Sequence, residues 1–569
     1  MKYITLLFLF FSFTALSQKI DWRELSADVL TQAKAENKIV MLNLKANWCH
    51  WCHVMDDSTY ANSEVQAYIL KHFIPVKADQ DANPELSARY KEYGWPATIF
   101  INGDGEDVVK RAGYIAPQPF LRLLKAIVAD PSPEYETAVL TNIITSNSSD
   151  STVLNDLQNA FENALDYKDG GFDQDQKYIE NDTYEYALFN SVDPKVKDWI
   201  TTSVNGAKQL CDPAWGGVYQ YSTHDDWKHL HFEKLLSIQT RYLRIFNYYQ
   251  LYHENQASTQ QNIDGIMSYI NRFLKQDNGL FSNAQDADLV QGEHAEEYFK
   301  LSDKERMKLG VPKIDSNTYT ENNAQLAFSL LKLSYTAENS EYSSVSQGIT
   351  TALLKRKASN NLYYHASSKR AVWSLKDQIG MALLMTENLK VNDENAEMKQ
   401  NLGQLLGAIE KLYITKNGSA KSFVGDNGLP AQPLIEENIQ LARIYNWYSH
   451  FTKEKKYADL AQNIYDYLVH PKVAEEYYSQ PALLMLAKEL NEAPFEFNFL
   501  QNMDGSNLAN HAKAYAPFFS LFATYSKGNL PKEKQELFGS FDINVLFVCT
   551  ANYCSNPIYD NGEVVAFFK

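Results

Sequence analysis

The segment Cys49-His50-Trp51-Cys52-His53 decides the fold of the first part of this chain. It follows a run at 39–44 in which every residue except Asn43 is apolar. Such a run before a helix-like stretch is typical of a buried strand that passes into a helix. The dipole and free N–H groups of a helix N-terminus stabilise a thiolate. The sequence therefore predicts a redox dithiol, with Cys49 as nucleophile and Cys52 as resolving thiol.

The same five residues are compatible with two other kinds of site. Cys-x-x-Cys-His is also the attachment signature of a c-type haem. Cys49, Cys52, His50 and His53 are also ordinary types of zinc ligand. Local sequence does not separate these alternatives, but a strand directly before the motif is not expected of a haem attachment site. We therefore expect no metal ion and no other cofactor.

The residues after the motif predict an alternation of strands and helices. We expect helices after the motif and at 63–73, a strand at 74–79, a helix at 84–93, a turn and strand over 94–101, a hairpin at 102–105 and a helix at 117–128. This order resembles thioredoxin, in which a cis-proline loop faces the dithiol and binds the extended substrate. The segment Gly94-Trp95-Pro96 stands where that fold places its cis-proline.

One position departs from the thioredoxin pattern. Thioredoxins carry a buried acid six residues before the first cysteine, and here that position is Asn43, which cannot act as a base. Lys45 could favour a thiolate instead, although a solvated side chain is an equally good interpretation. A charged His50 would stabilise the Cys49 thiolate and make the disulfide more oxidising. The other residues predicted to tune the dithiol or to hold substrate are Trp48, Trp51, Trp95 and Pro96.

Composition limits the class of protein. At 569 residues, the chain is too long for one thioredoxin domain. Its content of 45% hydrophobic and 22% charged residues is that of an ordinary soluble protein. A net charge of −17 argues against nucleic acid or an anionic membrane as a partner.

The first residues predict export. A short basic start precedes an apolar stretch at 4–16, and Ala15 and Ser17 provide small residues for cleavage before Gln18. We expect residues 1–17 to be a signal peptide and the mature protein to be secreted or periplasmic. No later stretch is long and apolar enough to predict a membrane span.

The remaining cysteines are few. Cys549 and Cys554 are spaced for a small terminal disulfide, with unpaired thiols or a thiol relay to the first pair as alternatives. Cys211 is expected to be a small buried hydrophobic residue.

A long helical region follows the first domain. We expect the thioredoxin-like domain at 18–132, a linker at 133–152 and a helical domain at 153–569 that includes the terminal cysteine segment. Apolar residues recur on one helix face, and Gly-rich aromatic breaks occur at 169–172, 215–219 and 278–281. Helix pairs separated by such breaks predict an α/α toroid of about six hairpins around a central pit.

The whole chain resembles the spermatogenesis-associated protein 20 family over about residues 22–569. The motifs that carry the resemblance lie at 48–55, 169–172, 231–236, 286–288 and 548–554. The resemblance implies a toroid like those of six-hairpin glycosidases and N-acylglucosamine 2-epimerases. One loop departs from it, because residues 176–179 lack the Pro-Lys-Phe-Pro usual in the family.

Four polar residues of the toroid are candidates for a site in its pit. They are His231, Glu233, Asp286 and Asp288, and sugar-acting toroids use such acid/base groups beside stacking aromatics. The candidate aromatics are Trp215, Tyr219, Tyr221 and Trp227. The alternative is structural, since carboxylates often cap helices and histidines often lie in cores.

Three functions follow from these patterns. The favoured one is an exported thiol–disulfide oxidoreductase acting on protein thiols and disulfides, with the toroid recognising the substrate. The second is a carbohydrate-active protein, with a glycan or other small ligand in the pit and an accessory thioredoxin domain. The third is a binding or assembly factor whose dithiol senses oxidation.

Overall fold

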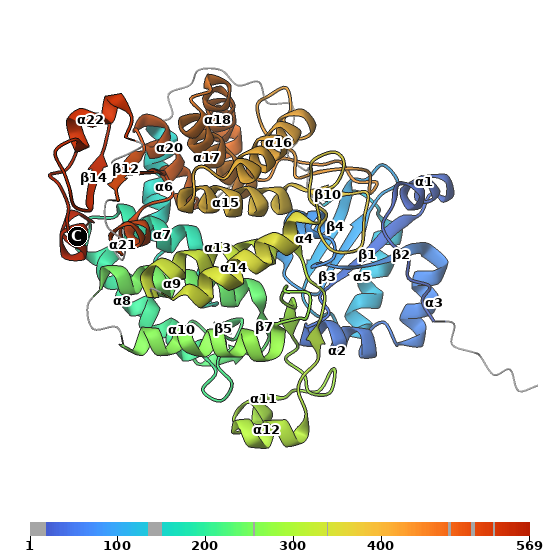
Figure 1. Ribbon diagram of the computed structural model, residues 1–569. Helices are drawn as coiled ribbons and strands as arrows, with labels where there is room; N and C mark the ends of the chain where they lie inside the picture. The colour runs from blue at the N-terminus through green and yellow to red at the C-terminus, as the bar shows by residue number, and fades with distance from the viewer. Residues whose placement is uncertain are drawn as a thin grey trace, which may run out of the picture.

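The computed structural model describes residues 19–134, 151–253, 257–337, 339–475, 479–501, 507–526 and 530–568. The predicted signal peptide and most of the predicted linker lie outside these residues. Figure 1 shows the N-terminal domain in blue at one end of a helical body, and a small C-terminal unit in red at the other.

The N-terminal domain is thioredoxin-like, as the sequence predicted. Its elements are α1 (Ala27–Glu36), β1 (Ile39–Lys45), α2 (His50–Ser58), α3 (Ser63–His72), β2 (Phe73–Asp79), α4 (Pro84–Tyr90), β3 (Ala97–Ile101), β4 (Asp107–Ala112) and α5 (Pro117–Ala129). The strand order is β2-β1-β3-β4. Strand β1 runs parallel to β2 and antiparallel to β3, so it is central and buried on both faces.

Alternate side chains of β1 enter two separate cores. Val40 and Leu42 pack with α1 and α4 on one face of the sheet. Met41 packs with α3 and α5 on the other face. This period of two fixes the register of β1 and therefore the point at which the chain leaves the sheet for α2.

The helical body is a closed ring of paired helices. The inner helices are α7 (Asn181–Asn190), α9 (Leu236–Tyr252), α13 (Thr320–Ala337), α15 (Leu375–Val391), α17 (Ile435–Thr452) and α20 (Pro481–Asn491). Each contacts the next in this order, and α20 contacts α7. The outer helices are α8 (Pro194–Ala207), α10 (Ala257–Tyr269), α14 (Ser340–Leu354), α16 (Ala396–Leu412), α18 (Lys455–Leu468) and α6 (Ser151–Asn163). Helix α6 pairs with α20, so the first helix of the body completes the last hairpin.

Burial separates the two rings. Inner helix α15 is buried almost all round, whereas outer helix α16 buries one face. Short elements connect the hairpins: β5 (Tyr221–Thr223), β6 (His229–His231), β7 (Lys234–Leu235), β8 (Ala284–Gln285), α11 (Glu296–Phe299), α12 (Asp303–Leu309), β9 (Ile314–Asp315), β10 (Trp373–Ser374), β11 (Phe423–Val424) and α19 (Pro471–Ala474). Strands β7, β8 and β9 form a small sheet beside the N-terminal domain.

The C-terminal unit contains a sheet that the helical periodicity did not predict. Its elements are β12 (Phe495–Leu500), α21 (Leu508–Tyr515), β13 (Ser520–Tyr525), α22 (Lys532–Phe538), β14 (Val545–Cys549) and α23 (Asn561–Phe568). The strand order is β13-β12-β14. Among the described residues, no helix is long and apolar enough to cross a membrane.

Candidate functional site

Cys49 and Cys52 form a disulfide at the start of α2. Cys49 is the N-cap residue of the helix, and its Sγ accepts a hydrogen bond from the Cys52 N–H at 3.2 Å. The sulfur therefore occupies the place that a serine or aspartate oxygen takes in an ordinary cap. Free N–H groups at this position stabilise negative charge, which favours Cys49 as the thiolate once the bond is reduced.

The predicted substrate loop lies beside the disulfide. The Trp95–Pro96 peptide bond is cis and leads into β3. Trp95 packs against the cluster that contains Trp48, Cys49 and Cys52. The structure thus brings the sulfurs and the proline loop together, as in the thioredoxin arrangement expected from the sequence.

The toroid covers the disulfide. Cys49 and Cys52 are only 5% and 2% exposed, and they pack against Ala284 of β8 and Leu235 of β7. Trp51, in contrast, is 41% exposed and stacks on Tyr114. A partner that reacts with Cys49 must therefore enter between the two domains.

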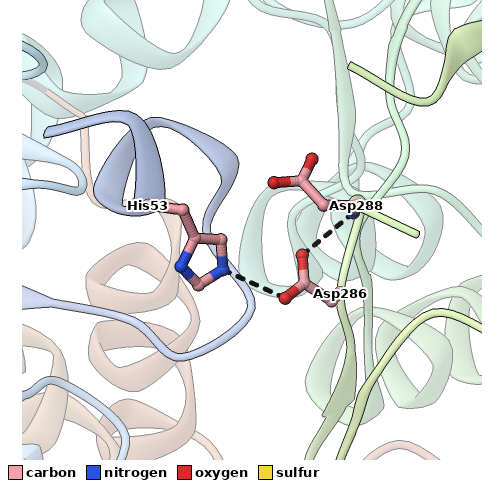
Figure 2. A group of neighbouring side chains, drawn as sticks. All are labelled: His53, Asp286 and Asp288. Carbon is pink, nitrogen blue, oxygen red and sulfur yellow. Dashed lines mark hydrogen bonds and ion pairs between the residues drawn. The ribbon is translucent and has the colours of Figure 1, made fainter. Parts of the chain in front are cut away.

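Two histidines of the motif bind aspartates of the toroid. His50 Nδ1 lies 2.7 Å from Asp288 Oδ1, and His53 Nε2 lies 3.0 Å from Asp286 Oδ2. Figure 2 shows His53 on α2 facing the two aspartates on the segment that follows β8. The backbone N–H of Asp288 donates to Asp286 Oδ1 at 2.9 Å, which holds the two carboxylates side by side.

Glu233 and His231, two more of the residues predicted for the toroid site, interact electrostatically with the histidine–aspartate pairs. Burial, with the charges of Asp286 and Asp288, raises the pKa of Glu233 to about 7. Burial, together with the neighbouring imidazoles of His50 and His294, lowers the pKa of His231 to about 4. A carboxyl of pKa near 7 can exchange protons at neutral pH.

The main cavity at this end of the toroid is separate from the site formed by His50, His53, Asp286 and Asp288. It has a volume of about 470 Å³ and lies where the inner helices α7, α9, α13, α15 and α17 begin. Trp48 and Trp95 line it from the N-terminal domain, and Tyr319 lines it from the toroid. The sequence placed His231, Glu233, Asp286 and Asp288 in this pit, whereas the structure sets the two aspartates against α2. The predicted stacking residues Trp215, Tyr219 and Trp227 are buried in packed cores.

Several polar residues at the domain contact were not predicted. Trp48 Nε1 donates to Asp81 Oδ2 at 2.6 Å, and Asn283 Nδ2 donates to the same oxygen at 2.8 Å. Burial, together with the charge of Asp79, raises the pKa of Asp81 to about 7. His365 Nε2 donates to the Asp81 carbonyl at 2.7 Å. These residues belong to no motif, and no signal in the sequence distinguishes them.

The structure also shows the surroundings of Lys45 and of the three remaining cysteines. Lys45 Nζ forms an ion pair with Asp56 at 2.8 Å. Cys549 and Cys554 are joined in a disulfide. Cys211 is a free, half-buried thiol, and burial raises its pKa to about 12.

These features define a thioredoxin-like domain with a Cys-x-x-Cys disulfide, joined to an α/α toroid. The family model Thioredox_DsbH, described as "Protein of unknown function, DUF255", matches residues 11–137. Mouse spermatogenesis-associated protein 20 is 25% identical over 310 residues, which are 47% of this chain and 39% of that protein. The predicted resemblance to this protein is thereby confirmed, although the match spans less than half of the relative's length.

Two further proteins are each similar to one part of the chain. The disulfide bond reductase DsbH of Chlamydia pneumoniae is 28% identical over 103 residues, 16% of this chain and 61% of that protein. The structure of a cellobiose 2-epimerase from Bacillus thermoamylovorans is 13% identical, with a TM-score of 0.45, and the match covers 56% of this chain and 86% of the epimerase.

Proposed function

We propose that this protein is an exported thiol–disulfide oxidoreductase that acts through Cys49 and Cys52 on disulfides of other proteins. The observation that carries the proposal is the Cys49–Cys52 bond at the N-terminus of α2, beside the Trp95–Pro96 loop. The apolar stretch at 4–16 supports export, and oxidising compartments are where protein disulfides persist.

The reaction in the reducing direction starts from the free dithiol. The Cys49 thiolate attacks one sulfur of the substrate disulfide, and the other substrate sulfur leaves as a thiolate that takes up a proton. Cys52 then attacks Cys49 Sγ, which closes the Cys49–Cys52 disulfide and releases the second substrate thiol. Two electrons pass from the protein to the substrate. An external dithiol must then reduce the Cys49–Cys52 disulfide before the next cycle. The oxidising direction is the reverse.

The toroid limits which substrates reach the sulfurs. Because Leu235 and Ala284 cover the disulfide, the substrate enters where the domains meet or after they separate. The cavity walled by Trp48 and Trp95 lies next to this contact and offers room for an extended segment. We therefore assign substrate recognition to this cavity.

The test is turnover of a protein disulfide by the full-length chain. The wild type should reduce a model protein disulfide in the presence of a dithiol donor, and Cys52→Ala should accumulate a mixed disulfide through Cys49. Cys554→Ser, which breaks only the second disulfide, is the matched control. Unchanged turnover in Cys49→Ser would eliminate the proposal.

A second candidate is a carbohydrate-active site in the toroid. Asp182 lines the cavity, and burial, with the charges of Glu180 and Glu185, raises the pKa of its carboxyl to about 7. A carboxyl that keeps its proton near neutrality is suited to general acid catalysis. A panel of glycans and N-acyl hexosamines tests this candidate, which predicts activity that is lost in Asp182→Asn and retained in Cys49→Ser.

A further inference from the structure

We propose that His53, Asp286 and Asp288 bind a divalent metal ion of the zinc class, which joins α2 to the toroid. The site is separate from the dithiol chemistry proposed above and does not require it. It also departs from the expectation, based on sequence alone, that the protein holds no metal.

The first argument is geometric. One donor atom from each of the three side chains lies within 4.8 Å of the other two. His53 Nε2 and Asp286 Oδ2 are 3.0 Å apart. Two ligands of a tetrahedral zinc ion with bonds of about 2.0–2.1 Å are separated by about 3.3 Å. His53 and Asp286 therefore need to separate by only a few tenths of an ångström, and the Asp288 donor atom, within 4.8 Å of both, moves in to complete the site.

The second argument is charge. Asp286 and Asp288 are 1% and 2% exposed, and Glu233 is buried close to them. In the described part of the chain the two aspartates contact His50 and His53, and no lysine or arginine there forms an ion pair with any of the three carboxylates. Buried carboxylates require compensating charge. A divalent cation balances the two aspartate charges, and imidazole binds such a cation in its neutral form.

The third argument is the set of polar atoms left unpaired around the group. His50 Nε2 and Glu233 Oε2 are buried and accept or donate no hydrogen bond among the described residues. Both belong to side chains that interact with the aspartates, His50 through its bond to Asp288 and Glu233 through its charge. Buried polar groups normally have partners. Water on a bound ion would supply a donor to Glu233.

The hydrogen bonds to the two aspartates from Asp288 N–H, Gly292 N–H and His50 are compatible with an ion. The bond from His53 Nε2 to Asp286 would be replaced, because Nε2 binds metal through its lone pair with the ring proton on Nδ1. Each carboxylate oxygen has two lone pairs, so an oxygen that accepts one hydrogen bond can also bind metal. The Asp288 N–H and the Gly292 N–H hold Asp286 and Asp288 in place. His50 does the same for Asp288 from the other domain. Such outer contacts orient ligands in metal sites.

The experiment uses the full-length chain with both disulfides closed, so that no thiolate can bind metal. After treatment with a chelator and dialysis, the protein is titrated with Zn²⁺, and bound metal is measured by mass spectrometry and calorimetry. We expect one zinc ion per chain, with affinity reduced at least about tenfold in His53→Gln and Asp286→Asn. X-ray absorption should show nitrogen and oxygen ligands at about 2.0–2.1 Å and no sulfur at about 2.3 Å.

The matched control is His365→Gln, which also breaks a histidine–aspartate contact at the domain boundary but lies outside the three ligands. It should bind zinc as the wild type does. If Asp286→Asn fails to fold, a rise in the melting temperature of the wild type on zinc addition, absent in His53→Gln, still tests the site. No zinc bound by the oxidised wild type, or binding only after reduction that disappears in Cys49→Ser, would overturn the proposal.

Discussion

The two disulfides of this chain have different surroundings. Cys49–Cys52 caps a helix beside His50, which contacts the buried carboxylate of Asp288, and the buried carboxyl of Glu233 interacts with that pair. Cys549–Cys554 joins the end of β14 to the segment after it, and Cys549 packs among Phe538 and Phe547. Disulfide reactivity depends on the charge around the sulfur. The first environment favours a redox bond, and the second favours a structural one.

The largest expected difference between the two disulfides is in activity. Cys49→Ser should reduce the turnover of a protein disulfide by at least about 1,000-fold, because the attacking sulfur is lost. Cys554→Ser should stay within about twofold of the wild type, because the C-terminal unit that contains it lies at the opposite end of the toroid from the N-terminal domain (Figure 1). Single-turnover assays with purified proteins measure both. Comparable losses in the two variants would remove the functional contrast.

The next effect concerns pH and is expected where the N-terminal domain meets the toroid. The pKa of Asp81 is about 7 in the folded chain, against about 3.9 for a free aspartate. Because the folded pKa is raised, the contribution of Asp81 to stability is fully present below about pH 4 and is lost as the pH rises towards 7. Asp81→Asn should remove this loss and raise the melting temperature at pH 8 but not at pH 4.

Asp104→Asn is the control, since Asp104 is an exposed partner of Lys34 in the same domain. It should leave the dependence of the melting temperature on pH as it is. If Asp81→Asn melts with the same pH profile as the wild type, the carboxyl of Asp81 is already ionised in the folded chain.

A smaller effect is expected from opening the second disulfide. Its cysteines are five residues apart, and closing so short a loop stabilises a fold by roughly 2 kcal/mol. Cys554→Ser should therefore lower the stability of the C-terminal unit by about that amount without affecting the N-terminal domain. Hydrogen exchange resolved by segment measures this, with faster exchange expected in β12 and β14. Faster exchange in β1 would contradict the local role.

The smallest effect should come from Trp51, the exposed residue of the motif. Trp51→Ala removes a stacking partner of Tyr114 and an apolar surface next to the disulfide. Lost aromatic contacts of this kind correspond to about 1 kcal/mol, so KM should rise by roughly fivefold or less with kcat unchanged. A large fall in kcat would assign Trp51 to the chemical step.

Local patterns were enough to predict much of this protein. The apolar run before Cys49 and the hairpin at 102–105 led to the N-terminal fold, and the helical periodicity after residue 153 led to the toroid. The C-terminal sheet, formed by β12, β13 and β14, was missed because the helical periodicity found from residue 153 was extended to the end of the chain.

The composition of the site could not be predicted in the same way. His50 meets Asp288 across 238 residues and His53 meets Asp286 across 233 residues. No period or spacing connects positions so far apart. The aromatic residues expected in the pit were misplaced for a related reason, since a Trp or Tyr beside a glycine turn can equally well fill a core, as Trp215 and Trp227 do.

The sequence by itself determined that two cysteines stand at the first turn of a helix after a buried strand, because strand alternation and helix periodicity are properties of neighbouring residues. Only the tertiary structure decided that the toroid covers those sulfurs and sets two aspartates against the histidines of the motif. That outcome depends on the closure of six helix pairs and on the docking of one domain against another, and such long-range packing is not encoded in any single stretch of the chain.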